Sequence, residues 1–311
     1  MKINNIVTNE SIELSKSGGN YILDSVDWDS PIVTTNTYRV PYQIGESQSG
    51  VIVGTRSPVI TGYVIADIKE HEYIGMSWDE YYETQERMIE EQKLYLDKFF
   101  SIYQDLRIEV NGYYLDARPT KPIAYSSLEI ENNEVLCLFV VQLECYNPLF
   151  YKDKKNVSLA MTKAMFHFPL VIPKNKKLIF GEVMRRKSVN IKNDSDIDEG
   201  CIIRINATGG TVENPKIYNV NTGEYIGFEN VTLNDGDYLT VTTKVGEENA
   251  IKHELATGKD ESIIGKLIDG SKFLQIQKGE SFYAYEVLEQ YKNNIEINLE
   301  FTEHFFNFRG M

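Results

Sequence analysis

The stretch Arg107-Ile108-Glu109-Val110-Asn111-Gly112-Tyr113-Tyr114-Leu115-Asp116 carries the clearest structural signal in this sequence. An Asn-Gly pair tolerates the positive φ angles of a type I′ turn, so it predicts a two-residue loop between paired strands. Ile108 and Val110 lie two residues apart and therefore share one face of the first strand. The stretch predicts an antiparallel hairpin.

The same alternation of short segments and turns recurs along the whole chain, as it does in antiparallel β structure. Further turn signals are Asn132-Asn133, Asn221-Thr222-Gly223, Asp235-Gly236, Asp269-Gly270 and Lys278-Gly279. A second hairpin is expected to pair residues 128–131 with residues 135–145. The nearly continuous apolar run Val135–Val141 suggests a central strand that is buried on both faces.

One segment, from Ser77 to about Tyr103, predicts a long helix instead. Ser77 and Glu80 match a capping box, in which each residue satisfies a backbone N–H of the first turn. The expected buried stripe is Tyr81, Met88, Tyr95 and Phe99.

A chain of 311 residues exceeds one comfortable hydrophobic core, so two domains are expected. The polar run at 152–156 places the seam between Tyr151 and Pro173, and the β pattern restarts near Leu178. We therefore expect domains at 1–160, with the helix at about 77–103, and at 161–311. Strand-like runs of the second domain are Ile202–Ala207, Val231–Leu233, Tyr238–Val245, Phe273–Gln277, Ser281–Tyr285 and Ile295–Phe301. The predicted fold class is mainly β, and the second domain is expected to be a β-sandwich or jelly roll.

The charge balance disfavours a nucleic-acid reader. Acidic residues number 46 against 32 basic ones, which gives a formal net charge of −14 and long-range repulsion from phosphates. The first residues show no secretion signal, and no run of about 18 apolar residues could span a bilayer. We expect synthesis in a cytoplasm and no membrane insertion.

The motifs of common enzymes and metal sites are missing. The three cysteines, Cys137, Cys145 and Cys201, have no metal-type spacing and are expected to be buried. His253-Glu254 begins like a zinc-protease helix, but Thr257 replaces the second histidine. The acids of Asp194–Gly200 alternate as in a calcium loop, yet the twelfth position is Ile205, so a solvated turn is favoured. We therefore expect no enzyme activity, no catalytic residues, no metal and no cofactor.

Aromatic residues are more informative, because tyrosine is favoured at surfaces that are half buried and half wet. The chain has 20 tyrosines and 14 phenylalanines, most of which are expected in the cores. Phe305-Phe306-Asn307-Phe308-Arg309 would favour aggregation unless it docks. Docking on its own domain and docking on a neighbouring molecule remain equally open.

The order of these elements resembles the phage distal tail protein family. In the first half the resemblance rests on Val26-Asp27-Trp28-Asp29-Ser30-Pro31-Ile32-Val33-Thr34-Thr35-Asn36-Thr37-Tyr38-Arg39-Val40-Pro41, the strand-rich stretch at 51–67, the helix, the Asn-Gly hairpin, the apolar strand and Tyr146–Tyr151. In the second half it rests on Gly200–Ile205, Asn234–Val241 and Ile268–Leu274. It implies a β-sandwich or split barrel with one long helix, followed by a galectin-like jelly-roll β-sandwich.

The resemblance also implies a structural role in a phage tail or a phage-derived tailocin, at the tail tip, with synthesis in the host bacterial cytoplasm. The expected partners are copies of the chain in a homo-hexameric ring, the tail tube protein, and a hub, tail-associated, receptor-binding or fibre protein. DNA would be present only in transient passage through the lumen. Candidate inter-subunit or docking contacts are Trp28, Tyr38, Arg39 and Phe306. The alternative is a carbohydrate-binding adhesion module that contacts the host cell wall, and the tail type remains open.

Overall fold

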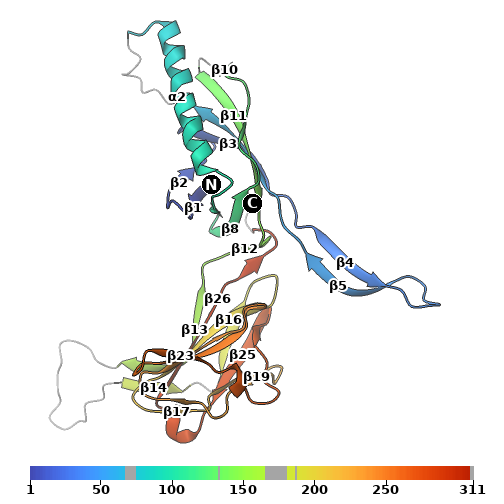
Figure 1. The fold of residues 1–311 in the computed structure, drawn as a ribbon, viewed down its shortest axis with the longest axis vertical. Helices are drawn as coiled ribbons and strands as arrows, with labels where there is room; N and C mark the ends of the chain where they lie inside the picture. The colour runs from blue at the N-terminus through green and yellow to red at the C-terminus, as the bar shows by residue number, and fades with distance from the viewer. Residues whose placement is uncertain (67–74, 132–133, 165–180, 186–187, 309–311) are drawn as a thin grey trace, which may run out of the picture. The chain divides into compact units, whose positions relative to one another are not determined.

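The chain divides into two compact units in the computed structural model. Unit 1 comprises Met1–Tyr151 and Phe306–Met311, and unit 2 comprises Lys152–Phe305. The structure describes all residues except 67–74, 132–133, 165–180, 186–187 and 309–311, and at 161–164 and 181–185 it describes only the backbone. Figure 1 shows the strands and the long helix that the described residues form in these units.

This division differs from the domain boundaries expected from the sequence. The expected boundary between residues 160 and 161 falls inside strand β13 (Lys155–Ala164). Residues 152–156 were expected to be a polar break, whereas Lys155 and Asn156 pair with strand β26 (Ile295–Phe301). No pattern in the sequence indicates that residues 306–308 return to unit 1.

Unit 1 is built on an antiparallel sheet in the order β2-β1-β7-β8-β11-β6-β3. Its elements are β1 (Lys2–Asn5), β2 (Ser11–Glu13), β3 (Tyr21–Asp27), β4 (Val33–Tyr38), β5 (Ser47–Val53), β6 (Val59–Ile65), α2 (Trp78–Phe99), β7 (Leu106–Val110), β8 (Tyr113–Pro119), β9 (Ala124–Tyr125), β10 (Glu129–Glu131), β11 (Glu134–Glu144) and β12 (Phe150–Tyr151). Strands β9 and β10 pair with β11, and β12 pairs with β8.

Both hairpins predicted for unit 1 are confirmed. Strands β7 and β8 pair across Asn111 and Gly112, whose φ angles of 51° and 76° are those that the Asn-Gly signal required. Strand β10 pairs with the start of β11. In the first hairpin local turn chemistry sets the register, which explains why the sequence was sufficient to predict it.

Strand β11 departs from the prediction that it is buried on both faces. Its residues alternate between buried and half-buried, and the buried ones include Val135, Cys137 and Phe139. Its apolar run therefore covers one full core face and one partly exposed face. Composition cannot distinguish these cases, because exposed β positions also favour β-branched and other apolar side chains.

Helix α2 begins as predicted, with Ser77 as N-cap and Glu80 completing the capping box. It ends at Phe99, earlier than the expected end near Tyr103. Its buried face is also rotated from the predicted stripe. The buried residues are Gln85, Ile89, Leu96 and Phe99, so only Phe99 was predicted correctly. The Gln85 Oε1 atom accepts a hydrogen bond from the Val135 backbone N–H at 3.0 Å, which fixes the helix against the start of β11.

Unit 2 is a β-sandwich. Its elements are β13, β14 (Gly181–Arg185), β15 (Val189–Asn193), β16 (Glu199–Ala207), β17 (Val212–Glu213), β18 (Lys216–Asn219), β19 (Tyr225–Gly227), β20 (Thr232–Leu233), β21 (Tyr238–Thr242), β22 (Asn249–Glu254), β23 (Lys259–Ser262), η1 (Ile264–Lys266), β24 (Gln275–Ile276), β25 (Gly279–Glu286), η2 (Glu289–Tyr291), β26 and β27 (His304–Phe305). One sheet has the order β14-β13-β26-β16-β21-β22-β23 and the other β15-β25-β18-β19. Both contribute to a single apolar core, for example through Ile203 and Tyr283. A strand overlaps each run expected in this unit, although the strands at 231–233, 238–245 and 273–277 are shorter than predicted.

All three cysteines are buried and free. Burial raises the pKa of Cys145 to about 12 and that of Cys201 to about 11. Because only the thiolate is nucleophilic, the raised pKa and the burial both slow the reaction of these thiols at pH 8. We expect the folded chain to resist a thiol reagent such as Ellman's reagent at pH 8 and the urea-unfolded chain to react fully. Rapid reaction of any thiol in the folded chain would contradict this expectation.

Candidate assembly surface

Strands β4 and β5 form an arm that stands apart from the main sheet of unit 1 (Figure 1). Among the described residues each of these strands pairs only with the other. The arm continues outward from β3 and β6, which pair with each other up to Asp27 and Val59. The chain thus leaves the sheet after β3, runs out and back through the arm, and re-enters the sheet at β6.

One face of the arm is apolar. Val33 lies opposite Val53 and Thr35 lies opposite Val51, so these four side chains share a face. The exposed fractions are 58% for Val33, 51% for Val51 and 38% for Val53. We call Val33, Val51 and Val53 the valine face. An isolated two-stranded ribbon is at best marginally stable in water, so the arm gains stability if another surface covers the valine face.

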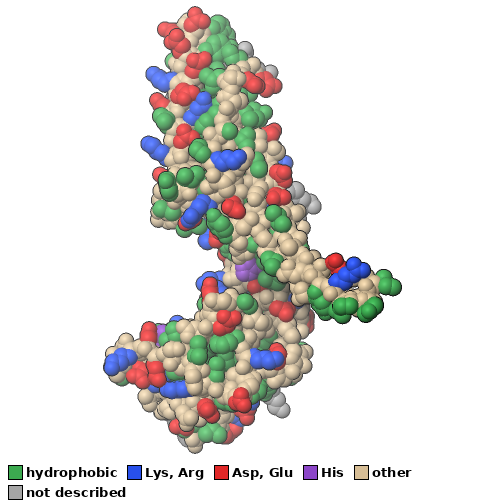
Figure 2. Space-filling view, turned by 45° about the vertical axis from the view of Figure 1, so that its right-hand side comes forward, with side chains coloured by type: hydrophobic (Ala, Val, Ile, Leu, Met, Phe, Trp, Pro, Cys, Tyr) green, Lys and Arg blue, Asp and Glu red, His purple; other side chains and the backbone are tan. Residues whose placement is uncertain are grey.

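The tip of the arm, residues 39–46, is also exposed. Tyr42 and Ile44 are fully exposed, and Val40 is half exposed. Two residues selected from the sequence lie here: Tyr38, at the end of β4, is 53% exposed, and Arg39 follows it on the surface. Figure 2 shows hydrophobic side chains, in green, gathered along the arm.

The other two selected residues, Trp28 and Phe306, lie at the base of the arm. The ring of Trp28 makes edge contacts with Phe150 and Phe308, at centroid distances of 5.4 and 5.2 Å. Phe150 and Phe308 also contact each other, at 5.1 Å. Within unit 1, residues 306–308 therefore dock on the aromatic rings beside the arm.

Arg56 completes this base. Its side chain is fully buried, and its backbone N–H and C=O groups pair with those of Cys145. The guanidinium lies 4.7 Å from the centre of the Phe150 ring, and Nη2 donates a hydrogen bond to the Phe306 carbonyl. The Nε and Nη1 atoms have no hydrogen-bond partner, and burial lowers the pKa of Arg56. A buried cation with so few partners depends strongly on the one acceptor that it has.

The sequence did not single out Arg56, the valine face, Tyr42 or Ile44. The run Gly50-Val51-Ile52-Val53 is the one available signal, but it equally suits a strand in a core. For the four selected residues, a role between subunits stays a prediction. The structure brings Trp28 close to residues 306–308 and places Tyr38 beside Arg39 on the arm.

The outward face of unit 2 carries a row of polar and aromatic side chains on neighbouring strands. The Arg204 guanidinium lies 4.0 Å from the Tyr238 ring centre, and the His253 ring stacks on Tyr238 at 4.2 Å. His253 Nδ1 lies 2.6 Å from the Asp260 carboxylate. Because β21 lies between β16 and β22, Tyr238 is flanked on both sides. These contacts stabilise the sheet and leave the Tyr238 ring poorly placed to stack a ligand.

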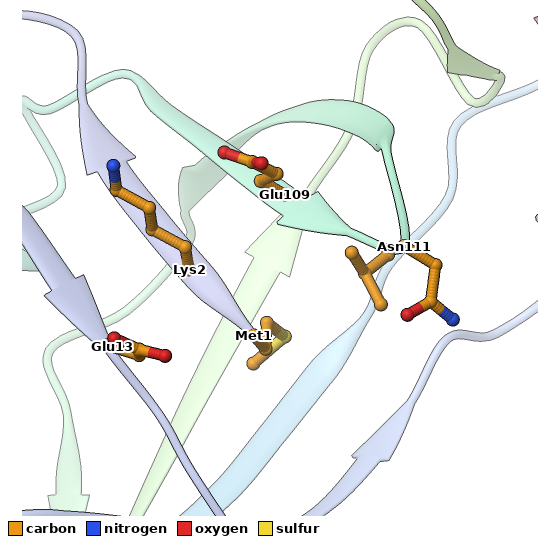
Figure 3. A pocket seen from close by; sticks show the side chains of 6 residues that line it. Met1, Lys2, Glu13, Glu109 and Asn111 are labelled. Atoms are coloured by element: carbon orange, nitrogen blue, oxygen red, sulfur yellow. The ribbon is translucent and has the colours of Figure 1, made fainter.

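A pocket of about 310 Å³ opens in unit 1 where β1, β2 and β7 lie side by side (Figure 3). Its lining residues are Met1, Lys2, Glu13, Glu109, Val110 and Asn111. Lys2 pairs across the strands with both Glu13 and Glu109, so the charges partly compensate. This lining contains neither a histidine nor a hydroxyl or thiol nucleophile, and it supports no catalytic assignment.

The loop that resembled a calcium site engages lysine instead. Asp194 pairs with the Lys192 ammonium at 2.8 Å, and this hydrogen bond lowers the pKa of the Asp194 carboxyl. Within the described residues, no three His, Cys, Asp or Glu side chains gather as metal ligands would. In the same part of the chain, no helix combines the length and apolar character needed to cross a membrane.

These features define a class: in its described residues, a two-unit, mainly β protein with a long helix and an arm whose valine face is exposed. The sequence matches no protein-family model and no curated protein. The structure is similar to the crystal structure of the SPP1 Dit protein, described as a paradigm of the hub adsorption apparatus in phages that infect Gram-positive bacteria. That similarity has a TM-score of 0.58 at 11% identity and covers 92% of this chain and 94% of that chain.

A weaker similarity, with a TM-score of 0.41 at 10% identity, is to the baseplate of phage P2 in its activated conformation with Ca. It covers 97% of this chain and 97% of that chain. The first similarity shows that this chain has the fold of the SPP1 Dit protein over nearly its whole length. At the level of the fold, it confirms the resemblance that the sequence suggested.

Proposed function

We propose that this chain is a structural distal tail protein of a phage or phage-derived tail. Copies of it form a hexameric ring that joins the tail tube to the hub or fibre proteins. The observation that carries the proposal is the arm, whose valine face is exposed in the single chain. A surface of this kind suits a protein that is completed by its neighbours and carries out no reaction itself.

The geometry of the arm supports contact between copies. Strand β4 has six residues, and at about 3.3 Å per residue it extends about 20 Å from its base. That length suits an element that reaches a neighbouring molecule. A closed ring repeats one heterologous interface, in which an arm on one copy meets a different surface on the next. Tyr38 and Arg39 would then lie at the far end of this contact.

The partners follow from the shared fold and from charge. The fold of a hub protein suits contacts with a tail tube on one side and with a hub, receptor-binding or fibre protein on the other. The net charge of −14 suits a lumen through which DNA passes transiently without adhering. The particle would carry this chain at its tail tip, after synthesis in the host bacterial cytoplasm. The galectin-like character of unit 2 remains a prediction.

The carbohydrate-binding alternative has less support from the described residues. Sugar sites stack a ring on a free aromatic face. Tyr238 lies on the outward face of unit 2 but is flanked by Arg204 and His253. Binding of the full chain to a glycan array would favour the alternative, and a Tyr238→Ala variant would show whether this face is responsible.

Mass photometry of the purified full chain, alone and mixed with its tail tube protein, tests the proposal. We expect a species with six times the mass of the 35.7 kDa chain in at least one of these samples. The contact should persist at high salt, because apolar burial is not screened as surface ion pairs are. A chain that stays strictly monomeric both alone and in the mixture with its tail tube protein would overturn the proposed ring.

A further inference from the structure

One short segment contacts both legs of the arm where they join the sheet. Trp28 directly follows β3 on the outgoing leg, and Arg56 lies three residues beyond β5 on the returning leg. The ring of Phe308 contacts Trp28, and the carbonyl of Phe306 accepts a hydrogen bond from Arg56. Phe150 lies against both legs, since it contacts Trp28 and the Arg56 guanidinium.

The backbone of these two legs leaves the regular strand pairing at this place. Asp29 adopts a φ of 49°, a conformation that few non-glycine residues adopt, and its N–H donates to the Asp27 carboxylate at 3.0 Å. On the returning leg, Gly54 donates to the Ile32 carbonyl at 2.7 Å. The register of β3 with β6 ends at Asp27, and that of β4 with β5 begins at Val33. Between those points few ladder hydrogen bonds hold the arm in a fixed direction.

Where the strand pairing is interrupted, the contacts of residues 306–308 hold the two legs of the arm against the sheet. Three aromatic rings in mutual edge contact resist rotation, because the favourable arrangement is lost when one ring moves. The Arg56 guanidinium is buried with two unpaired nitrogen atoms, so losing the Phe306 carbonyl would leave a third group unsatisfied. Moving the returning leg away from this segment therefore carries a desolvation penalty as well as lost packing.

We infer that residues 306–308 are a latch that fixes the direction of the β4–β5 arm through Trp28 and Arg56. The latch is a positioning element, because it does not itself form part of the valine face or the tip. The effect of the latch on ring assembly rests on the proposed function. The effect of the latch on the arm is independent of that function, because the latch and the arm both belong to unit 1 of a single chain.

The test is a distance measurement between the arm and the sheet in the full chain. Gln48→Cys on the exposed side of β5 and Lys121→Cys between β8 and β9 provide two exposed sites for nitroxide labels. The native cysteines are buried and do not compete for the label. Double electron–electron resonance then reports the distribution of distances in three backgrounds: otherwise unchanged, Phe308→Ala and Phe308→Tyr.

We expect one narrow peak in the unchanged background, loss of that peak in Phe308→Ala, and its recovery in Phe308→Tyr, which keeps the ring. Phe282→Ala is the matched control, because it removes an exposed phenylalanine from unit 2. A distribution in Phe308→Ala that matches this control overturns the latch. Circular dichroism checks the fold, and Phe308→Leu, which keeps apolar volume without a ring, replaces the alanine variant if that variant unfolds.

The two proposals fail in different ways. If the unchanged chain forms no ring but Phe308→Ala loses the narrow peak, the latch stands and the proposed function fails. If the ring forms and the peak is unaffected by Phe308→Ala, the proposed function stands and the latch is wrong. Mass photometry of the labelled samples reports the ring and double electron–electron resonance reports the peak, so one preparation gives both readings.

Discussion

Replacing Val51 with aspartate is expected to abolish ring assembly while leaving the fold of unit 1 intact. Val51 is 51% exposed in the single chain, so the charge can remain hydrated there. In a ring that covers the valine face, each interface would lose an apolar contact of about 1 kcal/mol, because only the exposed half of the side chain remains to be covered. That loss corresponds to about a fivefold weaker interface, and burying the new carboxylate weakens it further.

The effect is large because a ring repeats the same weakened interface all the way round. Thr34→Asp is the matched control, since it places the same charge opposite Ile52 on the other face of the arm. Mass photometry measures the loss of assembly, and thermal unfolding followed by circular dichroism checks the monomer. Equal loss in both variants would mean that the arm acts through its charge and not through the valine face.

Replacing Glu303 with alanine is expected to destabilise unit 2 more than any surface charge substitution. The Glu303 side chain is only 3% exposed, and its carboxylate accepts hydrogen bonds from the Lys155 ammonium at 2.5 Å and the Asp194 N–H at 2.7 Å. Removing it leaves two partly buried donors, the Lys155 ammonium and the Asp194 N–H, without their shared acceptor, at a cost of about 2 to 4 kcal/mol. We expect a cost in the lower part of that range, because the Lys155 side chain is 39% exposed and its ammonium can still be hydrated.

Hydrogen exchange read by mass spectrometry can assign the loss to the correct unit. We expect faster exchange in peptides from unit 2, whereas the fluorescence of Trp28 and Trp78 in unit 1 stays unchanged. Glu300→Ala is the matched control. Glu300 pairs with Lys154 on the surface, where such pairs contribute less than about 1 kcal/mol. Equal destabilisation of unit 2 by the two substitutions would show that the buried carboxylate stabilises the unit no more than the surface one does.

Features that depend on neighbouring residues in the chain were predicted correctly. The Asn111-Gly112 turn and the Ser77 cap are examples, because a positive φ and a first helical turn are each satisfied within a few residues. The helix face was wrong for the opposite reason. Whether Met88 or Ile89 turns inward depends on where the sheet meets the helix, and both choices fit a helical period.

The candidate assembly surface could be predicted only in part. Tyr38 and Arg39 were selected as loop residues and do lie on the exposed arm. The valine face was missed, because alternating valines give the same sequence pattern whether that face of the strand packs on a core or is exposed to solvent. Trp28 and Phe306 were selected as unusual aromatics, and nothing local indicated that both belong to the base of the arm.

The sequence alone determined that this chain is mainly β, with a capped helix, two local hairpins and an acidic surface, because each of these follows from nearby residues or from composition. Only the tertiary structure decided which strands form an arm without a core and that Arg56 meets the backbone of Phe306, 250 positions along the chain. Such a contact depends on the path of the whole chain and on the burial of groups that no local pattern records. For this reason the candidate assembly surface and the proposed latch follow only from the tertiary structure.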